Sequence, residues 1–144
     1  MSSMTVGLPL TWRRIPERYN LIGSECEICH TKYFPVRRIC PQCRRKGKMK
    51  EVKLSGKGKV YSYTRIYAPP SGFELDAPYM IAIIELEEGP RLTAQVEDCN
   101  ARDVKIGTPV EMIFRKIQED GKEGLIHYGF KFKTVSGKSN ILQE

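Results

Sequence analysis

The stretch that decides the fold is Cys26–Cys43, CEICHTKYFPVRRICPQC, because it contains two Cys-x-x-Cys pairs. Cys26 and Cys29 form the first pair, and Cys40 and Cys43 form the second. Each pair can form a turn in which two thiolates approach one metal ion. Two such turns supply the tetrahedral four-sulfur shell that structural Zn2+ prefers. The pattern therefore predicts a zinc ribbon, and the alternative of disulfides is disfavoured in a reducing compartment.

The predicted metal site is structural rather than catalytic. Four thiolates close the coordination shell and leave no open position for a water molecule. Iron in the same tetrahedral all-sulfur geometry is the alternative metal. The ten residues between the pairs are enough for one hairpin, which we expect over Tyr33–Ile39. The remaining cysteine, Cys99, stands alone and is expected to be a small buried residue.

The chain of 144 residues is predicted to contain a helical arm at 1–23, the zinc ribbon at 24–47 and a strand-rich domain at 48–144. In the arm, Trp12, Ile15 and Tyr19 recur at helical spacing, but Pro16 cannot continue a helix. We therefore expect two short helices, with Pro16 opening the second. The arm either packs Trp12 and Tyr19 on the rest of the protein or docks on a partner.

The strand-rich domain is predicted to be a five-stranded antiparallel barrel. The expected strands are Lys59–Tyr67, Tyr79–Leu86, Arg91–Val96, Val110–Ile117 and Leu125–Lys133. Five strands in about 85 residues leave no room for crossover helices. A Greek-key OB-fold barrel is the most economical way to close such a sheet, and a small antiparallel barrel of another topology or a sandwich is the alternative. In each case the fold class is mainly β.

The first of these strands carries an aromatic face. Strict alternation predicts two faces, with Val60, Ser62, Thr64 and Ile66 on one and Tyr61, Tyr63, Arg65 and Tyr67 on the other. The connection that follows, Ala68–Pro78, contains three prolines. It is expected to be a surface loop beside a binding face.

Charge is distributed unevenly along the chain. Residues 1–60 hold fourteen basic and four acidic residues, whereas residues 61–144 hold ten and thirteen. The segment from Arg37 to Lys59 contains ten basic residues and only one acidic residue, Glu51. This run is either a solvated surface or a surface that meets phosphates, those of nucleic acid or of a nucleotide-bearing cofactor such as coenzyme A.

Other features narrow the class of protein. No apolar run approaches the length of about 20 residues that a membrane span needs. The first residues show no targeting pattern, so we expect a cytoplasmic protein. His30 and His127 lie in no recognisable nucleophile or metal motif, and we therefore expect that the chain is not an enzyme.

The order of the motifs resembles that of the acyl-CoA-associated zinc-ribbon/OB-fold family. The stretches that carry the resemblance are PLTWRRIPERYNLIG at 9–23, the two cysteine pairs, GKGKVYSYTRIYAPP at 56–70, APYMIAIIELEEGPRLTAQV at 77–96 and IGTPVEMIF at 106–114. The resemblance implies a rubredoxin-like zinc ribbon after N-terminal helices and before an OB-fold barrel.

The same resemblance implies a non-catalytic acyl-CoA-binding or scaffold subunit that partners thiolase-superfamily enzymes. In archaea, members of this family bridge acetoacetyl-CoA thiolase and HMG-CoA synthase, so that a thioester intermediate passes between them in the mevalonate pathway. Bacterial relatives accompany other thiolases and steroid side-chain aldolases.

Coenzyme A joins a pantetheine arm to an anionic nucleotide, so its binding partner needs an apolar channel beside a few cations. The residues expected to bind it are Arg37 and Arg38 from the ribbon and Lys57, Lys59, Tyr61 and Tyr63 from the first barrel strand. Ordinary surface or packing roles are the alternative for these residues.

A single-stranded nucleic-acid binder is the alternative function, because tyrosines beside lysines also form a stacking platform. The net negative charge of residues 61–144 argues against that function.

Overall fold

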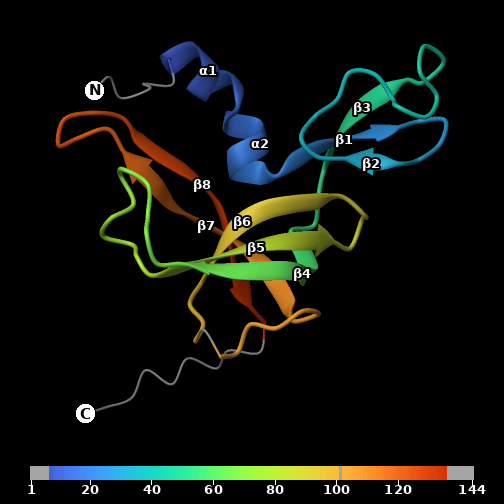
Figure 1. Cartoon of the computed structure of the whole chain (residues 1–144). Coiled ribbons are helices and arrows are strands. Elements are labelled where there is room, and N and C mark those ends of the chain that lie inside the picture. Colours follow the sequence, from blue (N-terminus) through green and yellow to red (C-terminus); the bar gives the residue numbers. More distant parts are fainter. Residues whose placement is uncertain (1–6, 101, 136–144) are drawn as a thin grey trace. The chain divides into compact units, whose positions relative to one another are not determined.

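The computed structural model describes residues 7–100 and 102–135 and confirms the mainly β fold class (Figure 1). The described chain forms two compact units. Of the described residues, the first unit contains 7–55, 88–90 and 114–130, and the second contains 56–87, 91–100, 102–113 and 131–135.

Two short helices open the described chain, as predicted. They are α1 (Leu8–Arg13) and α2 (Ile15–Asn20). Pro16 lies in the first turn of α2, where its missing N–H group leaves no helical hydrogen bond unmade. Leu21 ends α2 in the left-handed conformation, with φ of 52°, and its side chain is buried. No helix in the described residues is long and apolar enough to cross a membrane.

The ribbon is a three-stranded antiparallel sheet in the order β2-β1-β3. Its strands are β1 (Ile22–Cys26), β2 (Lys32–Tyr33) and β3 (Met49–Lys53). Ile22 pairs with Lys53, so the sheet extends beyond the segment 24–47 on both sides. A side chain at Gly23 would meet the carbonyl oxygen of Tyr33 at 2.5 Å, and this close approach requires glycine.

The predicted hairpin over Tyr33–Ile39 is wrong. The hairpin of the ribbon is formed instead by β1 and β2, which enclose the first cysteine pair. β2 ends at Tyr33, and residues 34–39 contain no strand. Pro35 has no N–H group to donate to a sheet, which explains why the pairing stops there.

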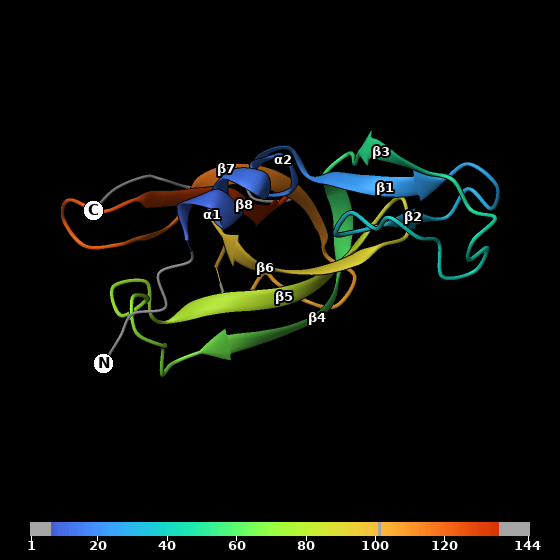
Figure 2. The ribbon, with the colours of Figure 1, turned by 90° about the horizontal axis from the view of Figure 1, so that it is seen from above.

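The remaining strands form a closed barrel in the order β4-β5-β6-β8-β7. They are β4 (Lys57–Ile66), β5 (Tyr79–Leu86), β6 (Arg91–Glu97), β7 (Pro109–Glu119) and β8 (Ile126–Thr134). Figures 1 and 2 show β4, β5 and β6 side by side, and all of these neighbours pair antiparallel. β6 and β8 pair parallel, which is how the fifth strand closes the barrel. The predicted OB-fold topology is confirmed.

Alternating side chains of β5 and β6 form much of the barrel core. The buried members of the two strands are Met80, Ala82, Ile84 and Leu86 on β5 and Leu92, Ala94 and Val96 on β6. The other three strands contribute the buried side chains Val60 of β4, Val110 of β7 and Phe132 of β8. A period of two along each strand is the pattern of a sheet with one face toward the core.

A β-bulge in β4 changes which residues share a face. Lys59 pairs with Glu85 before the bulge, whereas Tyr63 pairs with Ala82 after it. The register shifts between Val60 and Ser62, so the extra residue moves every later side chain to the opposite face. The predicted alternation is therefore wrong beyond the bulge. Tyr63 and Arg65 share the face of buried Ala82 and Met80 rather than the face of Lys59.

Candidate metal centre and ligand-binding residues

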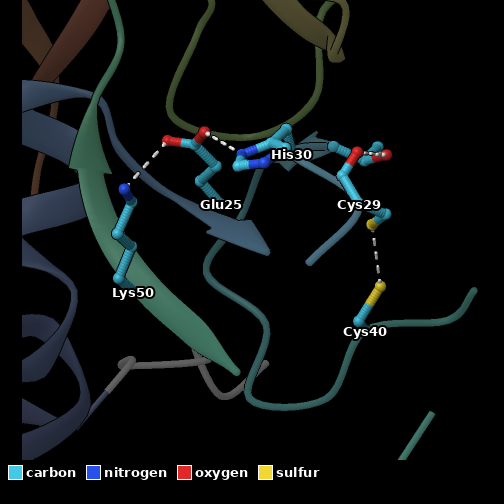
Figure 3. Close-up of polar contacts among 6 residues, drawn as sticks. Glu25, Cys29, His30, Cys40 and Lys50 are labelled. Atoms are coloured by element: carbon cyan, nitrogen blue, oxygen red, sulfur yellow. Dashed lines mark hydrogen bonds and ion pairs between the residues drawn. The ribbon is translucent and has the colours of Figure 1, made fainter. Parts of the chain in front are cut away.

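Four cysteine sulfurs converge in the ribbon. The Sγ atoms of Cys26, Cys29, Cys40 and Cys43 all lie within 4.8 Å of one another. The Sγ atoms of Cys29 and Cys40 are 3.5 Å apart (Figure 3). In a tetrahedral site with Zn–S bonds of about 2.3 Å, the sulfurs are separated by about 3.8 Å. The four residues therefore fit one tetrahedral metal ion, with Cys26 and Cys40 buried.

Two similar turns bring the sulfurs together. The N–H group of His30 donates to the carbonyl oxygen of Cys26 at 2.8 Å, and the N–H group of Arg44 donates to that of Cys40 at 2.8 Å. His30 and Arg44 each follow the second cysteine of a pair, and both are left-handed, with φ of 55° and 52°. The same spacing thus folds into the same turn twice.

Gly47 allows the second turn to close. A side chain at this position would meet the Cβ atom of Cys40 at 2.7 Å and that of Cys43 at 3.1 Å. Real Cβ atoms do not approach so closely, so only glycine fits here. The sequence alone offered no signal for this role, because a glycine beside basic residues also occurs in loops.

Hydrogen bonding and burial distinguish the thiols of Cys40 and Cys43. The pKa of the Cys40 thiol is lowered to about 6, first by the backbone N–H of Cys43, with the Tyr33 hydroxyl also contributing. The pKa of the Cys43 thiol is raised to about 12, first by burial and then by the neighbouring thiols. Without a cation, the cluster cannot hold four negative charges at neutral pH, because thiolates repel one another. A dication removes that repulsion and deprotonates its ligands.

Contacts on the ribbon surface involve part of the basic run. The Glu25 carboxylate lies between His30 and Lys50, 3.7 Å from the Nδ1 atom of one and 3.7 Å from the Nζ atom of the other (Figure 3). The guanidinium of Arg37 lies 5.4 Å from the ring centroid of Tyr33. Arg37 and Arg38 are both exposed on the segment between β2 and Cys40, in the first unit.

The predicted coenzyme A residues of β4 are only partly together. Lys57, Lys59, Tyr61 and Tyr63 are all exposed, but Tyr63 lies on the other face of β4 beyond the bulge. Lys59 pairs with Glu85 at 3.9 Å, and Arg91 pairs with the same carboxylate at 3.4 Å. The Arg91 guanidinium covers the Tyr61 ring at 3.8 Å.

Sequence reasoning missed Glu85 and Arg91 as members of this surface. They are directly opposite one another in the register of β5 and β6. The turn residues Glu87–Pro90 could have predicted this pairing, because a short turn fixes which residues of the two strands lie opposite each other.

A cavity of 340 Å³ opens in the second unit, and its lining includes Arg65, Asp76, Glu97 and Cys99. Burial raises the pKa of the Cys99 thiol, and the nearby carboxylates of Asp103 and Asp98 raise it further. Cys99 therefore carries a proton at neutral pH and is a poor nucleophile.

Known proteins resemble the chain in sequence and in structure. Residues 51–115 match a family model described as the C-terminal OB-fold domain of ChsH2. A DUF35 domain-containing scaffold protein of Methanocaldococcus jannaschii is 58% identical over 125 residues, which cover 87% of this chain and 89% of that protein. The benzoylsuccinyl-CoA thiolase subunit BbsA of Geobacter metallireducens is 30% identical over 116 residues, which cover 81% of this chain and 75% of that subunit.

A solved structure entitled Ltp2-ChsH2(DUF35) aldolase superimposes on the chain with a TM-score of 0.65 and 25% identity. The match covers 93% of this chain and 98% of that one. The similarity therefore includes the ribbon as well as the barrel.

Replacing Cys40 with serine should release the metal and unfold the ribbon, because structural zinc contributes about 10 kcal/mol or more of folding free energy. Zinc content by elemental analysis and thermal unfolding by circular dichroism measure the two effects. Cys99→Ser, which changes a cysteine outside the cluster, is the control and should retain zinc. A Cys40→Ser protein with full zinc content and unchanged melting temperature would rule out the four-thiolate site.

Proposed function

Since the chain belongs to the DUF35 scaffold-protein family, we propose that it is a cytoplasmic, non-catalytic subunit that binds acyl-CoA and bridges enzymes of the thiolase superfamily. The observation that carries the proposal is the 58% identity to a scaffold protein over 87% of the chain. The match covers 87% of this chain and 89% of that protein, so the two chains correspond over most of their length.

The names of two similar proteins support thiolase-type partners. One is a subunit of benzoylsuccinyl-CoA thiolase, and the other is a DUF35 chain in a complex named as an aldolase. For this chain the proposed partners are acetoacetyl-CoA thiolase and HMG-CoA synthase. The bridge holds the two enzymes together, so that the thioester product of the first reaches the second in the mevalonate pathway. Proximity of this kind raises the effective concentration of an intermediate without any new bond chemistry.

The proposal gives the four cysteines a structural role. Cys26, Cys29, Cys40 and Cys43 bind one Zn2+ ion, which ties the two turns of the ribbon together. A shell of four protein ligands has no position for a substrate. Together with the protonated Cys99 thiol, this supports a binding role rather than a catalytic one.

Exposed basic residues are the proposed contacts for acyl-CoA. Lys57 and Lys59 on β4 provide cations for the phosphates of the nucleotide, and Arg37 and Arg38 provide a separate pair of cations on the ribbon. Tyr61 provides aromatic surface for the adenine or pantetheine portion beside these lysines, whereas Tyr63 offers its ring on the other face of β4. Glu85 neutralises part of the charge of Lys59 and Arg91, so binding requires the phosphates to compete with this carboxylate.

Co-expression with both proposed enzymes from the same genome tests the bridge. A tagged thiolase should capture HMG-CoA synthase from nuclease-treated lysate when this chain is present and should fail to capture it when this chain is omitted. Gel filtration of the eluate should give one peak that contains all three proteins. Capture of the synthase without this chain, or association of this chain only with nucleic acid, would contradict the proposal.

Changing Lys57 and Lys59 to glutamine should weaken the binding of coenzyme A by about tenfold or more, because each removes a charge-assisted hydrogen bond to phosphate. Isothermal titration of the full chain with coenzyme A measures the affinity. Lys105→Gln, which changes an exposed lysine on the loop before β7 in the same unit, is the matched control and should leave the affinity unchanged. Equal affinities of the double variant and the wild type would remove these two lysines from the site.

A further inference from the structure

Helix α1 exposes an apolar face. Leu8 and Trp12 are four residues apart and therefore lie on the same side of the helix, with 68% and 77% of their surface exposed. Leu10 is exposed as well, and α1 contains no buried residue. Among the described residues, the Trp12 ring takes part in no aromatic pair or cation–π contact.

The helix that follows α1 is anchored in its own unit. The Tyr19 ring of α2 meets the Phe114 ring edge-on, with centroids 5.0 Å apart, and Phe114 stacks on Tyr128 at 5.5 Å. Arg14 joins the two helices directly, because its N–H group donates to carbonyl oxygens of α1 and it also caps α2. Trp12 is therefore presented on an ordered element, although the alternative expected from the sequence was that it packs as Tyr19 does.

The charge on the two helices is positive. Arg13, Arg14 and Arg18 lie on the two helices with only Glu17 to oppose them. None of the three arginines forms an ion pair within residues 7–100 and 102–135. Tryptophan and arginine are the residue types that contribute most to protein interfaces, since they combine large contact area with directed hydrogen bonds.

The charge also indicates what covers the helix. A second copy of this chain would place the same arginines opposite one another across a two-fold axis. Two chains of net charge +7 would repel as well. The partner that complements α1 is instead a different protein, one whose surface has an apolar pocket bordered by carboxylates. Such a pocket accommodates the Trp12 side chain, and its carboxylates pair with the arginines.

We propose that α1 is the docking helix for the thiolase-type partner, with Trp12 inserted into an apolar pocket whose acidic border meets Arg13 and Arg14. This inference rests on the proposed scaffold function and adds the surface through which one partner binds. The Tyr19 side chain instead packs within its own unit and anchors the helix pair through its contact with Phe114.

The test compares the affinities of full-length variants for purified acetoacetyl-CoA thiolase from the same genome. Trp12→Ala should weaken binding by about 30-fold or more, as expected for an interface tryptophan. Arg13→Glu combined with Arg14→Glu should slow association and reduce its dependence on salt. The melting temperature of both variants should match the wild type, because α1 contains no buried residue.

Tyr67→Ala is the matched control, since this aromatic side chain is 71% exposed and lies in the second unit, where its ring meets Arg65. It should bind the thiolase as the wild type does. Wild-type affinity of Trp12→Ala, or equal losses in Trp12→Ala and Tyr67→Ala, would overturn the docking helix while leaving the scaffold function intact. Failure of the wild-type chain to bind the thiolase would overturn both the docking helix and the scaffold function. A Trp12→Ala variant that loses only nucleic-acid binding would also overturn the docking helix.

Discussion

The convergence of four cysteine sulfurs within 4.8 Å is the constraint on which the ribbon depends. The described part of this module has few buried apolar side chains besides Cys26 and Cys40, chiefly Leu21 and Leu54. One of its three strands, β2, is only two residues long. A sheet this small cannot hold itself together by burying apolar surface. A metal ion bound by the four sulfurs would supply the missing stability, because the four sulfurs converge only when both turns are closed.

The barrel is stabilised in a different way. Its strands β5 and β6 alternate buried side chains with more exposed ones, and a closed order of five strands leaves no unpaired edge. In the described residues, the ribbon holds a cluster of four cysteine sulfurs, and the pKa of the remaining thiol, Cys99, is raised by burial. What the two modules do present is surface: the cations beside Tyr61 on β4 and the exposed face of α1. A chain built in this way is suited to binding other molecules and holding them near one another.

Local patterns predicted much of this arrangement. Cysteine spacing identified the ligand set because each turn is made within five residues, and Pro16 identified the break between the helices. Features that depend on contacts between strands were not predictable. The bulge in β4 has no marker in the sequence, yet it separates Tyr63 from Lys59. The hairpin expected over Tyr33–Ile39 failed because strand length depends on the partner strand, and Gly47 gained its role only through the approach of Cys40.

X-ray absorption spectroscopy at the zinc edge tests the central claim, which is that four thiolates and one metal ion hold the ribbon together. The protein as purified should give a first shell of four sulfur atoms at about 2.3 Å and no nitrogen or oxygen neighbour. A shell with fewer sulfurs, a shell completed by imidazole or water, or the absence of zinc from folded protein would contradict the account.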